Sequence, residues 1–167
     1  GTVWAPKKVL ATSTGSAADS RFGRGWTDGT NQGAAATAWD DTTNGSQDRV
    51  VNDKCITLID DAGTLLAEAG IVSLDSNGFT INWTTGGGSR IVSYLALSES
   101  VVTHVAVGSV ALRTASSPQS ITGLGFQPDA VLLAGVENQD AWGNSNRGGH
   151  AFGAALSPTD RHTSSHR

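Results

Sequence analysis

Residues 70–84 read GIVSLDSNGFTINWT and carry the clearest structural signal in the chain. Phe79, Ile81 and Trp83 alternate with polar residues, so this stretch is predicted to bury one face and to expose the other. The Asn-Gly pair at 77–78 is a strong hairpin signal, because both residue types tolerate positive φ. The pattern therefore predicts a β-hairpin. Its two strands are expected at 70–74 and 79–84.

Other stretches rich in apolar and β-branched residues predict further strands around this hairpin. They lie at 8–11, 49–59, 64–69, 90–97 and 101–112. The last of these, VVTHVAVGSVAL, is apolar on both faces, so we expect a second sheet or another subunit to cover both. Residues 65–69 (LLAEA) could compete as a helix but are too short to stand alone. About eight to ten strands joined by short turns predict an all-β fold, an antiparallel β-sandwich that resembles a jelly roll.

The composition limits the functional classes. Of the 167 residues, 21 are Gly and 16% are charged, which favours short strands and turns over long solvated helices. The net charge is −4 and no basic cluster occurs, so we expect no nucleic-acid partner. No apolar run is long enough to cross a bilayer, so we expect no membrane insertion. The single cysteine, Cys55, is expected to be buried and reduced. Methionine is absent, which indicates a processed segment or a piece of a longer chain.

Two stretches indicate an internal repeat. Residues 4–11 (WAPKKVLA) and 126–133 (FQPDAVLL) share an aromatic residue, a Pro two positions later, and then an apolar strand. Further along, Phe22-Gly23 matches Phe152-Gly153 in the same order. The alternative is that two edge strands look alike by chance.

The repeat predicts how the chain is divided. Residues 1–117 are expected to form one β-sandwich unit. Residues 118–167 are expected either to begin a second, related unit or to supply strands that complete the first sandwich.

Two of these motifs also resemble virion proteins of tailed bacteriophages. Residues 125–131 follow the pattern G-F-x-P-x-x-V, and residues 77–83 follow N-G-F-T-x-x-W. Tail, tail-fibre and capsid-decoration proteins often carry β-sandwich modules with such an opening strand and hairpin. The resemblance implies a structural, non-enzymatic homo-oligomer located in the virion, with copies of itself and other virion proteins as partners. It implies no catalytic residue and no cofactor.

Candidate chemical sites are weak. We expect His104 to be a sheet histidine, and the His162/His166 pair to lie in a solvated tail or loop rather than in a zinc site. Residues 41–48 (DTTNGSQD) offer oxygen ligands but lack the spacing of a calcium loop, which favours an ordinary turn. No G-x-S-x-G motif occurs, and no acid and base pair for a hydrolase can be named. We therefore predict no catalytic, cofactor-binding or metal-binding residues.

Three tryptophans offer an alternative function. Trp26, Trp39 and Trp142 lie among Gly and Asn residues, where exposed indole rings could stack on sugars or contact a partner. The chain would then be a carbohydrate- or receptor-binding module, with a host-surface glycan as a possible partner. The competing interpretation is that these rings cap the ends of the sandwich.

Overall fold

The computed structural model is all-β over its described residues, as the sequence predicts, and contains no helix there. The described residues are 2–8, 20–39, 46–86, 88, 91–98, 100–111, 116–136, 143–145 and 149–166. The strands are β1 (Thr2–Lys8), β2 (Ser20–Thr27), β3 (Gln32–Trp39), β4 (Ser46–Val51), β5 (Ile56–Ile59), β6 (Leu65–Asp75), β7 (Gly78–Thr85), β8 (Ser93–Leu95), β9 (Val131–Val136), β10 (Gly143–Ser145), β11 (His150–Ala155) and β12 (Arg161–His166).

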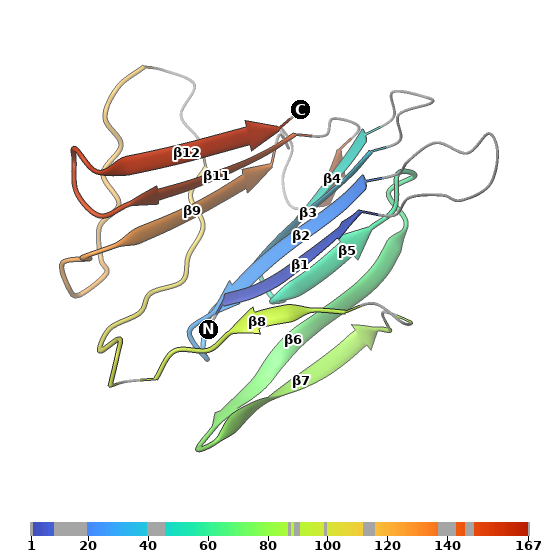
Figure 1. Ribbon diagram of the computed structural model, residues 1–167, viewed down its shortest axis with the longest axis horizontal. Helices are drawn as coiled ribbons and strands as arrows, with labels where there is room; N and C mark the ends of the chain where they lie inside the picture. The colour runs from blue at the N-terminus through green and yellow to red at the C-terminus, as the bar shows by residue number, and fades with distance from the viewer. Residues whose placement is uncertain are drawn as a thin grey trace.

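These strands form three antiparallel sheets (Figure 1). The first sheet has six strands in the order β10-β4-β3-β2-β1-β8. The second has three in the order β5-β6-β7, and the third has three in the order β12-β11-β9. In Figure 1 the third sheet lies on one side of the first, and the second lies on the other.

Strand β3 is buried on both faces, which explains its composition. It reads QGAAATAW, and its five central residues are all buried. Ala36 and Ala38 pack against Ile59 of the second sheet, whereas Ala35 and Thr37 face β9 and β11 of the third. Small side chains let the backbones of neighbouring layers come close, and the alternation of strand residues sends them to opposite faces.

Two glycines of β2 allow the second sheet to approach closely. A Cβ atom on Gly25 would lie 1.8 Å from the carbonyl oxygen of Cys55, and one on Gly23 would lie 2.6 Å from that of Thr57. Any side chain at either position would therefore push β5 away. Cys55 is fully buried and free, as predicted, and burial raises the pKa of its thiol.

Polar side chains also join the first and second sheets. The amide of Gln32 donates to the carbonyl oxygen of Ile71 at 3.0 Å and accepts from its N–H at 2.7 Å. Arg49 contacts Glu68 through Nη2 at 2.9 Å and through Nε at 3.3 Å. Because both members of the Arg49–Glu68 pair are largely shielded from water, this contact is stronger than a typical exposed ion pair.

The hairpin is confirmed, but its turn lies one residue earlier than predicted. Strands β6 and β7 pair antiparallel, and Gly78 is already in register with Asp75. The two turn residues are therefore Ser76 and Asn77, not Asn77 and Gly78. The register between β6 and β7 also shifts between Ile71 and Ser73. An extra residue in one strand changes which residues face each other across the hairpin, so the pairs differ from those expected from a regular alternation.

The strand predicted at 101–112 is wrong for the described residues 101–111. This segment, which we call the arm, forms no strand and leaves Val101, Val105 and Val110 exposed by 72%, 51% and 45%. Its composition suits a strand, but a strand needs a hydrogen-bonded neighbour, and none of the described strands pairs with it.

Most of the remaining predicted strands are recovered with shifted bounds. Residues 49–59 and 64–69 fall in β4, β5 and β6, and LLAEA is a strand rather than a helix. The strand expected at 90–97 shortens to β8. Of the strand expected at 8–11, only Lys8 is described, as the last residue of β1, and residues 9–11 lie outside the described residues. Pro6 is inside β1 and in register with Phe22. Beside Pro6 β1 has no partner in β8, so the missing N–H breaks no ladder there.

The two halves of the repeat are arranged similarly in part. Phe22-Gly23 lies in β2, the central strand of the β1-β2-β3 meander, and Phe152-Gly153 lies in β11, the central strand of the third sheet. Pro6 is inside its strand, however, whereas Pro128 precedes β9. From the second half, β10 adds to the edge of the first sheet beside β4. The division at residue 117 stays a prediction.

Candidate functional site

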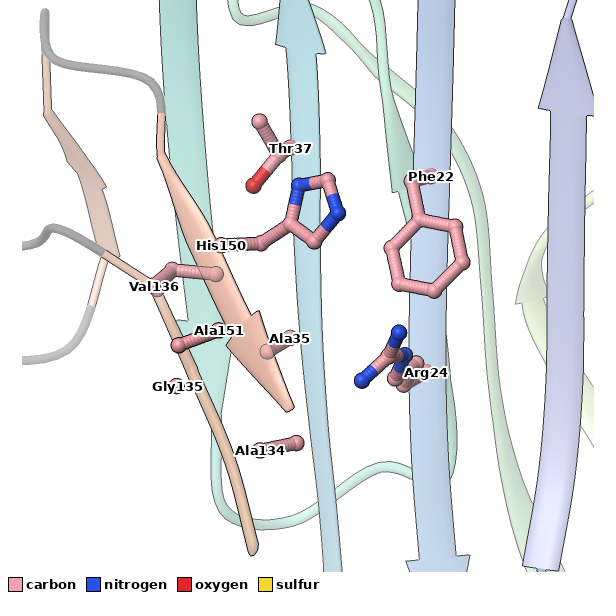
Figure 2. A pocket seen from close by; sticks show the side chains of 9 residues that line it. All are labelled: Phe22, Arg24, Ala35, Thr37, Ala134, Gly135, Val136, His150 and Ala151. Atoms are coloured by element: carbon pink, nitrogen blue, oxygen red, sulfur yellow. The ribbon is translucent and has the colours of Figure 1, made fainter. Parts of the chain in front are cut away.

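A small enclosed space lies where the third sheet covers the first. It is formed by β2, β3, β9 and β11, and Figure 2 shows the side chains around it. Its volume, counted as the region that the centre of a water-sized sphere can reach, is about 10 Å³. This is room for roughly one water molecule. Pockets that bind substrates or cofactors are usually tens of times larger. This space is therefore a joint between layers rather than a ligand site.

Arg24 is the central side chain of this joint. Its guanidinium carbon lies 4.3 Å from the centre of the Phe22 ring and 4.4 Å from that of Phe152. Both distances are within the range of cation–π attraction. Burial lowers the pKa of Arg24, yet an arginine starts so far above neutrality that it keeps its charge. The contact thus ties β2 of the first sheet to β11 of the third.

His150 makes the second aromatic contact across the same joint. Its ring stacks on Phe22 with centroids 4.9 Å apart and lies 6.0 Å from the Trp39 ring. In Figure 2 the imidazole points towards Phe22 and Thr37. His150 therefore continues the packing that Phe152 makes two residues later on the same strand.

Asp48 adds a buried carboxylate on this side of the first sheet. It is fully buried in β4, accepts a hydrogen bond of 2.7 Å from the hydroxyl of Thr37, and accepts one of 3.4 Å from the backbone N–H of Gly149. These contacts hold β3, β4 and the residue before β11 together. A buried carboxylate that accepts hydrogen bonds in this way joins neighbouring segments of the fold.

The other chemistry-bearing residues lie apart from this joint. His104 is exposed in the arm, not in the strand we expected, and stacks on Phe126 at 5.3 Å. His162 is in β12 rather than in a tail or loop, is exposed, and lies 3.3 Å from Asp160. In the described ranges no group of three His, Cys, Asp or Glu side chains is placed to hold a metal ion. Residues 40–45, which include most of the loop considered for calcium, lie outside the described residues.

Two of the three tryptophan candidates lie in the described part of the chain. Trp26 and Trp39 are half-buried in β2 and β3 rather than in loops. A Cβ on Gly33 would lie 3.1 Å from the indole nitrogen of Trp26, so this ring packs over β3. Trp142 lies outside the described residues.

Large apolar side chains are exposed on three parts of the described chain. On β6, β7 and β8 the exposed side chains include Val72, Leu74, Trp83, Tyr94 and Leu95. Along the connection from β8 to β9 they include Leu97, Val101, Val105, Val110 and Ile121. At the start of β9 they are Val131, Leu132 and Leu133. Exposed apolar side chains that form a contiguous patch are typical of sites that contact other proteins.

The connection that carries much of this surface is unusual in itself. From residue 96 to residue 130 the described part of the chain forms neither helix nor strand. Connections within compact domains rarely exceed about 15 residues without secondary structure unless they have a function. Its apolar composition is also opposite to that of a solvated linker. This segment is therefore the strongest candidate for a functional surface.

Sequence patterns indicate these features only in part. The matched dipeptides Phe22-Gly23 and Phe152-Gly153 indicate a repeat, but they do not predict that both Phe rings contact Arg24. The arm was recognised as apolar on both faces and in need of a cover. Its position outside the sheets could not be read from that pattern.

Comparisons with known proteins found no match to this chain. The chain matches no model of a known protein family, no curated protein and no solved structure. Among the described residues there is also no helix long and apolar enough to cross a membrane. The function must therefore be argued from the surface and the joint described above.

Proposed function

We propose that the chain is a non-enzymatic structural protein of a phage virion, which assembles with copies of itself and with other virion proteins through its β-sheets. The observation that carries this proposal is the exposed apolar surface of the β8–β9 connection and of strands β6 to β9. Burial of apolar surface is the main favourable term in protein association. A chain that leaves such side chains in water gains free energy when a partner covers them.

The interior of the chain supports an architectural role rather than catalysis. The small space at the Arg24 joint has room for only about one water molecule. The charged residues beside it, Arg24 and Asp48, are engaged with Phe22, Phe152, Thr37 and Gly149. They join layers of the fold.

The proposal includes the jelly-roll-like sandwich predicted from the sequence. It is supported by the packing of Ile59 of the second sheet against Ala36 and Ala38 of the first. The phage assignment, as tail, tail-fibre or capsid-decoration protein, rests on the motifs at 77–83 and 125–131.

Two experiments test the proposal separately. Mass spectrometry of purified particles from the source phage should detect peptides of this chain at a constant ratio to the major virion proteins. Their absence from particles would contradict the location in a virion. Sedimentation of the purified full chain should show self-association, and a monomer at every concentration would contradict assembly through its own surfaces.

A further inference from the structure

The arm has the composition of a strand, but its backbone pairs with none of the described strands. Residues 101–111 read VVTHVAVGSVA, rich in β-branched residues and free of Asp, Glu, Lys and Arg. Residues 104–111 run without a turn or a bend, yet they belong to none of the described sheets. Backbone N–H and C=O groups seek hydrogen-bond partners wherever water is excluded. The arm therefore has the composition of a strand, but the described part of its own chain supplies no neighbouring strand for it.

One contact fixes the orientation of the arm. The backbone N–H of Val107 donates to Oδ2 of Asp28 at 3.1 Å, so this amide points towards the body of its own chain. In an extended segment successive amides point to opposite sides. The amides of Ala106 and Gly108 therefore point away from the body, and both residues are exposed.

The second sheet provides an edge of matching chemistry. Strand β7 is the outer strand of the order β5-β6-β7, and no other described strand pairs with its free side. Its sequence, GFTINWTT, contains no charge, although exposed edges are commonly protected by charged residues or proline. Exposed Trp83 on β7 and exposed Leu74 on β6 offer apolar contacts for an added strand.

The other described edges fit less well. Strand β5, the other edge of the second sheet, has only four residues, all of them buried. Strand β12 carries Arg161 and is polar throughout, and strands β8 and β10 have three residues each. Strand β9 is uncharged but has six residues, whereas β7 has eight. The edge of β7 is therefore the best match to an arm of eleven residues without charge.

We propose that the arm of one copy adds as a strand to the β7 edge of a second copy, with the outward amides of Ala106 and Gly108 in the new ladder. The anchor between Val107 and Asp28 stays in place, because it uses the opposite side of the arm. Arm and edge are different surfaces, so the contact repeats from copy to copy and builds closed rings or open rows. This inference rests on the proposed self-assembly and names the surfaces that carry it.

Hydrogen exchange of the full chain at low and high concentration tests the pairing. Self-association should slow exchange in residues 104–111 and in β7 together. If oligomers form while these two segments exchange as fast as in the dilute sample, or if β9 is protected instead of β7, the strand addition is overturned and the self-assembly stands. If no oligomer forms at any concentration, both proposals fail.

A pair of proline variants tests the direction of the amides. Ala106→Pro removes an N–H that points to the second copy and should weaken association by about tenfold, the effect of one lost hydrogen bond. Val105→Pro removes an N–H on the same side as that of Val107 and should weaken association clearly less. Both variants lie in the arm, outside the buried core, so both should keep the unfolding midpoint of the dilute protein. Equal association constants for the two variants would overturn the proposed ladder.

Discussion

The backbone N–H of Val107 lies 3.1 Å from Oδ2 of Asp28, so one carboxylate connects the arm to the turn between β2 and β3. The other oxygen, Oδ1, accepts hydrogen bonds from the backbone N–H groups of Thr30 and Asn31 at 2.9 and 2.7 Å. Asp28 therefore shapes its own turn and also orients the arm. A substitution of Asp28 therefore tests both contacts at once.

Replacing Asp28 should destabilise both the turn between β2 and β3 and the attachment of the arm to it. Asp28→Ala removes the acceptor of the turn and of the arm, and should lower the free energy of unfolding by about 1–3 kcal/mol. The exchange of the Val107 amide should become faster in the same variant. Urea unfolding and hydrogen exchange measure the two effects. Asp129→Ala, at an exposed position before β9, is the matched control and should change stability by less than about 0.5 kcal/mol.

The same contacts predict a dependence on pH. Burial alone would raise the pKa of Asp28, but hydrogen bonds from Asn31, Thr30 and Val107 outweigh it and hold the pKa below its ordinary value of 3.8. A carboxyl with a lowered pKa in the folded state stabilises the fold fully above its unfolded pKa, and this contribution is lost as the pH falls through the folded pKa. The protection of the Val107 amide, measured as its exchange rate relative to that of an unprotected amide at the same pH, should therefore persist from neutral pH to about pH 4. It should be lost in stronger acid. A loss already at roughly pH 5 to 6 would show that another group controls the arm.

Two glycines in inner strands of different sheets, Gly25 in β2 and Gly153 in β11, should respond differently to alanine. At Gly25 the new Cβ would meet the carbonyl oxygen of Cys55 at 1.8 Å, so β2 and β5 must separate. We expect Gly25→Ala to cost about 3 kcal/mol or more. At Gly153 the nearest atom is Cγ2 of Thr163 at 3.4 Å, an ordinary contact. Gly153→Ala should thus change the unfolding midpoint little, and equal losses in the two variants would contradict the close approach of the sheets.

The joint at Arg24 predicts how the third sheet is held. Arg24→Ala removes the cation between the Phe22 and Phe152 rings, and should destabilise the chain by about 1–3 kcal/mol through two cation–π contacts and lost packing of its stem. Arg161→Ala, on exposed β12, removes the same charge without these contacts. Thermal unfolding compares the two variants. If Arg24→Ala were no more destabilising than Arg161→Ala, the joint would not hold the layers together.

The local features of the fold could be predicted from the sequence, whereas the features that depend on distant partners could not. The hairpin at β6 and β7 was found because alternation and turn residues act within a few positions. Its turn was misplaced by one residue because the bulged register near Ser73 depends on the packing of β6. The arm was predicted as a strand because β-propensity describes suitability for a sheet, not the presence of a neighbour.

The same difference between local features and contacts of distant segments applies to the arm and to the Arg24 joint. The apolar character of residues 101–112 and their need for a cover were visible in the sequence. The contacts of Phe22 and Phe152 with Arg24 join segments that are far apart in the chain. No local pattern specifies such a contact, although the repeated Phe-Gly pair marked both aromatic residues.

The most direct test of self-assembly is sedimentation velocity of the purified full chain over a wide range of concentration. We expect larger species to appear with increasing concentration, and to be weakened by Ala106→Pro more than by Val105→Pro. A chain that sediments as a monomer at every concentration would contradict assembly through its exposed apolar surface.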